Sequence, residues 1–129
     1  MNKEQLAREH RKRRRLERLG TNNPACTICG ETESLCLELH HIAQHGYGDE
    51  TAIVCRNCHR KLSDSQKDHP SPVRNAPSMV ECIAHFLIGL ADFLILLASK
   101  LREHGLYLIE EASKSFNNSK EVSDVDQSK

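Results

Sequence analysis

Four cysteines stand in two pairs with the same internal spacing, Cys26-x-x-Cys29 and Cys55-x-x-Cys58, and twenty-five residues separate the two pairs. A two-residue spacer lets both thiolates of a pair reach one ion, and two pairs complete a tetrahedral shell of four sulfurs. Buried free thiols would not require this paired spacing. The sequence therefore predicts a structural Zn²⁺ site, which is closed and leaves no open position for catalysis.

Three histidines lie beside these cysteines. His40 and His41 are adjacent and precede a glycine-containing loop, and His59 directly follows Cys58. Binding of both cysteine pairs to one ion would bring the two segments into contact, so we expect His40 and His59 to converge on a second, open metal site. Neighbouring residues of a strand point to opposite faces, which leaves His41 free for another role.

Each histidine also has an ordinary structural interpretation. His40 would then be a packed strand residue, and His41 a surface or DNA-contact residue. His59 would cap a helix or support the zinc site from outside.

The ordered set of motifs resembles the HNH family of nucleases, which share the ββα-metal fold, in its four-cysteine zinc-knuckle variant. The resemblance covers roughly residues 24–62, under a third of the chain. It rests on Cys26 and Cys29, the block LELHHI at 37–42, the loop with Gly46 and Gly48, and the segment IVCRNCH at 53–59. It implies a small α+β domain stapled by zinc.

The resemblance also implies an activity, the hydrolysis of DNA phosphodiester bonds with little intrinsic sequence specificity. By analogy with the family, His40 and His59 are ligands of a catalytic divalent cation (Mg²⁺, Mn²⁺, Zn²⁺ or Ni²⁺), and His41 is the general base. Such a cation would neutralise charge on a scissile phosphate. Histidine suits the role of base because its unperturbed pKa lies near neutral pH.

Two positions depart from the family pattern. Glu50 stands where the family usually has an asparagine, about five residues before the second cysteine pair, and Ser63 stands where a third metal ligand is common. These departures favour an alternative function, a catalytically inactive zinc module that binds nucleic acid or a protein partner.

Composition divides the chain into five segments. We expect a basic helical arm at 1–20, the HNH-like zinc domain at 21–70, a linker at 71–77, a long apolar helical segment at 78–112 and a disordered tail at 113–129. Within the zinc domain, strands are expected at 35–41 and 51–54, followed by a brief helix after Asn57 and a turn from residue 63.

A formal net charge of zero hides the basic arm. Residues 1–20 carry eight Lys or Arg against three Asp or Glu, whereas the rest of the chain is acidic on balance. We expect residues 3–18 to contact DNA phosphates in a salt-sensitive way, although a merely solvated charged segment would have the same composition. The absence of Trp and the scarcity of Phe and Tyr argue against a surface that stacks single-stranded bases.

The segment 79–101 is mostly apolar. When the segment is placed on a helix, its polar or small residues fall on one narrow stripe. This pattern predicts a helix with a narrow polar face and a wide apolar face. The stripe holds Glu81, His85, Gly89, Asp92, Ser99 and Glu103. We expect the wide apolar face to contact a second copy or a protein partner. Association with a membrane is the less favoured alternative because His85 and Asp92 would lie inside the bilayer.

The first residues are polar and basic and do not have the pattern of a secretory signal. Together with the metal-like spacing of the cysteines, this predicts a reducing, cytoplasmic location.

Overall fold

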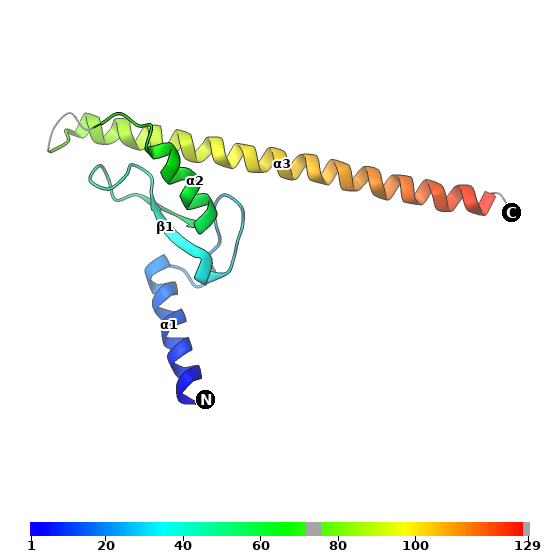
Figure 1. Cartoon of the computed structure of the whole chain (residues 1–129), viewed down its shortest axis with the longest axis horizontal. Coiled ribbons are helices and arrows are strands. Elements are labelled where there is room, and N and C mark those ends of the chain that lie inside the picture. The colour runs from blue at the N-terminus through cyan, green and yellow to red at the C-terminus, as the bar shows by residue number, and fades with distance from the viewer. Residues whose placement is uncertain (72–75, 128–129) are drawn as a thin grey trace. The chain divides into compact units, whose positions relative to one another are not determined.

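The computed structural model describes residues 1–71 and 76–127, with side chains described as far as Lys120 (Figure 1). The elements are α1 (Lys3–Leu19), a short 3₁₀ helix η1 (Ser34–Cys36), β1 (Leu37–His41), β2 (Thr51–Cys55), α2 (Arg56–Gln66) and α3 (Met79–Gln127). The predicted α+β class is confirmed. The chain forms two compact units, Met1–Leu97 and Ala98–Lys129, and α3 contributes to both.

The two strands form an antiparallel sheet in which Leu37 lies opposite Cys55 and His41 lies opposite Thr51. β2 is rich in β-branched residues, which fit a pleated backbone. β1 begins two residues later than expected because Ser34–Cys36 form η1, whose first turn is capped when the Glu33 carboxylate accepts a hydrogen bond from the Leu35 amide. The sheet therefore begins with Leu37 opposite Cys55, the first cysteine of the second pair.

The core of the first unit is small and is centred on Leu37, Val54 and Leu62, each at most 2% exposed. β1, β2 and α2 each contribute one of these side chains. Further members come from the first cysteine loop and from the helices on either side, namely Leu19, Ile28 and Phe93. Because Leu37 lies opposite Cys55 and Glu38 lies opposite Val54, Leu37 and Val54 are on opposite faces of the sheet, and both faces contribute to the core.

The basic segment forms α1, which has well-defined ends. Asn2 caps its first turn by accepting a hydrogen bond from the Gln5 amide, and Gln5 accepts one from the Asn2 amide in return. Gly20, with φ of 80°, ends the helix in the left-handed conformation that glycine adopts without strain. Leu19 is buried in the core and attaches this helix to the first unit.

The helices α2 and α3 are longer than expected. α2 continues to Gln66, into the expected turn, and residues 72–75 of the expected linker lie outside the described residues. α3 continues to Gln127, so the structure differs from the expected disordered tail at 113–129, whose last two residues also lie outside the described residues. No Gly or Pro follows Gly105. Lys114 pairs with both Glu110 and Glu111 one turn earlier, an arrangement that supports a helix.

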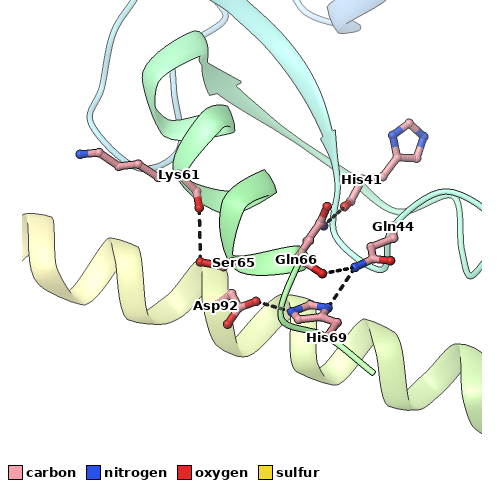
Figure 2. A network of polar contacts seen from close by, with 7 residues as sticks. All are labelled: His41, Gln44, Lys61, Ser65, Gln66, His69 and Asp92. Atoms are coloured by element: carbon pink, nitrogen blue, oxygen red, sulfur yellow. Dashed lines mark hydrogen bonds and ion pairs between the residues drawn. The ribbon is translucent and has the colours of Figure 1, made fainter. Parts of the chain in front are cut away.

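The structure corrects the expectation that the narrow polar face of α3 is exposed to solvent. His85 and Gly89 are buried, and Asp92 is engaged by His69, whose Nε2 lies 2.5 Å from the Asp92 carboxylate (Figure 2). Gln44 reaches the other nitrogen of His69 at 3.2 Å. The part of the stripe with His85, Gly89 and Asp92 therefore faces the protein's own domain, where the His85 ring stacks on Tyr47 and Asp92 meets His69, whereas Ser99 and Glu103 are exposed.

Replacement of Gly89 tests this packing. A Cβ at position 89 would overlap the backbone carbonyl of Ile42, which cannot move as a flexible side chain does. We expect Gly89→Ala to lower the free energy of unfolding of the metal-loaded chain by about 1–3 kcal/mol, as overpacking does, when measured by chemical denaturation.

Gly105→Ala is the matched control, because nothing lies within 4 Å of a Cβ at that position of the same helix. This change should leave stability unchanged or raise it by about 0.5–1 kcal/mol, the usual helical preference for Ala over Gly. Equal stabilities of the two variants would show that Gly89 does not contact the Ile42 backbone.

Candidate metal centre and the neighbouring histidines

The two cysteine pairs come together at one point. Cys26 and Cys29 lie in the loop after α1, Cys55 ends β2, and Cys58 lies in the first turn of α2. Their four sulfurs lie within 4.8 Å of one another, and Sγ of Cys29 is 3.6 Å from Sγ of Cys55. Tetrahedral zinc with bonds of about 2.3 Å requires sulfurs about 3.8 Å apart. The cluster therefore has the dimensions of a four-thiolate metal site, consistent with the predicted structural zinc.

Local backbone geometry shapes both pairs in the same way. The Cys29 amide points at Sγ of Cys26, and the Cys58 amide points at Sγ of Cys55, each at 3.5 Å. Gly30, with φ of 82°, closes the first turn, and its amide donates to the Cys26 carbonyl at 2.9 Å. Cys55 also caps the N-terminus of α2. Backbone amides thus face the sulfurs that would carry negative charge.

The thiols differ in their readiness to ionise. Burial raises the pKa of Cys26, but hydrogen bonds from the amides of Cys29, Cys55 and Ile28 outweigh burial and lower that pKa to about 7. Burial raises the pKa of both Cys29 and Cys58 above the usual value for a thiol. All six cysteines of the chain are free thiols. A cation is therefore needed to hold the cluster fully ionised, and binding it releases protons.

His40 and His59 lie side by side. Their ring centroids are 5.3 Å apart and the rings meet edge to face. His40 is only 2% exposed. Burial, followed by the nearby His59 and His41, lowers the pKa of His40 to about 4, so this imidazole is neutral at physiological pH. A neutral imidazole is the form that binds metals.

Glu38 joins this pair and was not predicted. Its carboxylate lies 2.6 Å from Nδ1 of His59 and 3.4 Å from Nε of Arg56. Because the Glu38 carboxylate occupies Nδ1, the other ring nitrogen, Nε2, is the one available to a ligand. The sequence pattern of β1 could have indicated that Glu38 lies near the histidines, since Glu38 and His40 are two residues apart and therefore share a face of the strand.

His41 has a different environment. Its ring lies 3.9 Å from the ring of His45, centroid to centroid, and its carbonyl accepts a hydrogen bond from Gln66 Nε2 at 3.0 Å. Figure 2 shows the His41 ring pointing away from the polar network at the end of α2. The residue is half-buried, in contrast to the buried His40.

The two departures from the family pattern lie in the loop between the strands and on α2. Glu50 is exposed, and its backbone carbonyl accepts a hydrogen bond from the Ile42 amide at 3.1 Å, which closes the loop between the strands. Ser63 is half-buried on α2. Within residues 1–71 and 76–120, the four cysteines form the single compact group of three or more His, Cys, Asp or Glu ligands.

Comparisons with protein-family models, with curated proteins and with solved structures found no match to this chain. The sequence motifs and the geometry therefore define the class, a small α+β domain with a four-cysteine group arranged to hold a metal ion.

Removal of the metal should unfold the first unit, because the core is too small to be stable without the ion. We expect a chelator to abolish the cooperative unfolding transition, and Cys58→Ser to purify with less than one equivalent of metal. Cys36→Ser is the control, since Cys36 is exposed and lies outside the group of four. Metal content and far-ultraviolet circular dichroism measure both effects. A chelated chain with an unchanged transition would refute a structural role for the metal.

Proposed function

We propose that the chain is a metal-dependent endonuclease of the HNH type that hydrolyses DNA phosphodiester bonds. The observation that carries the proposal is the juxtaposition of His40 and His59, with Nδ1 of His59 bound by Glu38. Zinc at the four cysteines serves as the structural ion. The two histidines serve as ligands of a second, catalytic cation, Mg²⁺, Mn²⁺, Zn²⁺ or Ni²⁺.

The histidine pair suits this role for electrostatic reasons. His40 is neutral, because burial and the neighbouring histidines lower its pKa to about 4, so it can donate a lone pair without first losing a proton. The Glu38 carboxylate orients the His59 ring through its contact with Nδ1. Two protein ligands leave open positions for water and for phosphate oxygens, where a divalent cation supplies Lewis-acid stabilisation of the developing charge.

His41 is the proposed general base. It adjoins His40 in the chain and is half-buried, outside the core cluster. A neutral imidazole in this position can take a proton from the attacking water.

The basic helix α1 is the proposed contact with the DNA backbone. Its arginines and lysines are mostly exposed, and Leu19 fixes its C-terminal end to the unit that holds both metal sites. Contacts to phosphates carry no sequence information, so cleavage is expected to show little site preference and to weaken steeply with salt.

One observation favours the second candidate, a zinc module without catalytic activity. His40 and His59 come together with Glu38 beside them, and among the described residues Glu50 forms no compact ligand group with them. The number of bound metal ions separates the candidates, because the enzyme binds a second equivalent of divalent cation and the module does not.

Plasmid nicking tests the proposed activity. Zinc-loaded protein with Mg²⁺, Mn²⁺ or Ni²⁺ should convert supercoiled DNA to the nicked form, and His41→Ala should reduce the rate by about 10²–10⁴-fold, the usual contribution of a general base. The control is His45→Ala, which removes the adjacent ring and should retain activity. Absence of nicking with every metal would favour the zinc module, and equal rates for His41→Ala and wild type would exclude His41 as the base.

Replacement of Glu38 tests the histidine pair separately. Glu38→Gln removes the carboxylate from His59 Nδ1, so the affinity for the second cation should fall about 10–100-fold while the zinc content stays the same. Asp49→Asn, in the exposed loop between the strands, is the matched control. Titration calorimetry of the zinc-loaded protein with Mn²⁺ measures the effect. An unchanged affinity would show that Glu38 does not support a metal ligand.

A further inference from the structure

The apolar side of α3 repeats every seven residues. One row contains only small residues, and the other contains leucine or valine, with alternate spacings of three and four between the rows. The small row is Ala84, Ala91, Ala98, Gly105 and Ala112, and the large row is Val80, Leu87, Leu94, Leu101 and Leu108. We call these ten positions the heptad face.

The heptad face is exposed along its whole length. Val80, Leu87 and Leu94 belong to the first unit and Leu101 and Leu108 to the second, and each of the five side chains is more than half exposed. The small residues between them are exposed as well. The helix contacts its own domain through other positions, including His85, Gly89 and Phe93.

A heptad of this kind is typical of a helix that packs along a second helix. Its spacing keeps one seam facing the partner over many turns, whereas an unrelated apolar surface has no reason to repeat at seven residues. The alternation of large and small side chains specifies the partner further. A large row packs best against a small row, because side chains then interdigitate at even density.

We propose that the heptad face pairs antiparallel with the heptad face of a second copy of this chain, with the two-fold axis near residue 96. This register sets each large residue against a small one on the other copy. The pairs are Val80 with Ala112, Ala84 with Leu108, Leu87 with Gly105, Ala91 with Leu101, and Leu94 with Ala98. A parallel pair would instead set Leu against Leu and Ala against Ala.

The size of the face fits a dimer. The thirty-three residues from 80 to 112 extend about 50 Å along a helix, and a strip about 10 Å wide gives about 500 Å² for each copy. Two copies then bury about 1,000 Å², the lower bound for a specific interface. Ile88, Ile95 and Ile109 flank the rows and enlarge the apolar contact.

A lipid bilayer is the competing occupant. By length and composition alone, the Met79–Lys120 part of α3 is long and apolar enough to cross a membrane. Lipid does not require a seven-residue alternation of small and large side chains, however. Asp92 is moreover held by His69 of the first unit, which a helix inside a bilayer could not contact. The seven-residue repeat and the contact of Asp92 with His69 therefore favour the second copy.

The mass of the full-length, metal-loaded chain in detergent-free buffer tests the proposal, by light scattering or sedimentation. Wild type should have twice the mass of one chain. Leu94→Glu and Leu101→Glu each place a charge in the seam, and each should raise the dissociation constant by about thirtyfold or more, as the loss of a central contact does. Leu106→Glu is the matched control, because Leu106 is 62% exposed on the same helix but lies outside both rows, and it should remain dimeric.

Complementary charges test the orientation. Leu94→Lys alone and Ala98→Glu alone should be monomeric, and their mixture should form a heterodimer, because these positions face each other only in the antiparallel register. A heterodimer of Leu94→Lys with Leu94→Glu would show parallel pairing and overturn the register. A monomeric wild type, recovery only with detergent or phospholipid vesicles, or loss of the dimer in Leu106→Glu would overturn the heptad face as the interface.

Discussion

The meeting of four sulfurs is the constraint on which the rest of the first unit depends. Leu37, Val54 and Leu62 form a core too small to hold the chain by apolar burial alone. An ion held by the four sulfurs would join the loop at Cys26 to the junction of β2 and α2, two places far apart in the sequence. Because the strands pair in a fixed register, the same constraint sets the level of β1 against α2.

The first turn of α2 connects the cysteine cluster, the histidine pair and the core. Cys58 faces the other sulfurs, His59 faces His40 and Glu38, and Leu62 enters the core one turn later. Successive helical residues point in different directions, so neighbours in the chain serve different centres. Any tilt of α2 would disturb the cluster and the histidine pair together, which explains how a structural ion can govern a proposed catalytic one without touching it.

α3 divides its surface between two contacts of different character. Its buried side depends on close approach at Gly89 and on the pairing of Asp92 with His69, both of which are specific to this domain. Its other side has the regular spacing of a helix that packs on another helix. Apolar composition alone does not distinguish these sides. His85, Asp92 and Phe93 face the domain, with Leu96 and Leu97 packed against its core, whereas Leu87, Leu94 and Leu101 are exposed.

Residue spacing alone determined the four cysteine ligands, the two strands and the α+β class, because local periodicity and ligand geometry are short-range properties of the chain. It also indicated that His40 and His59 would meet, since each adjoins a segment that the cysteines bring together. Only the tertiary structure decided that Glu38 binds His59 and that the stripe with His85 and Asp92 faces inward. Both depend on which distant surfaces come into contact, because the groups that meet these residues, His69 at Asp92 and the Tyr47 ring at His85, lie far away in the sequence.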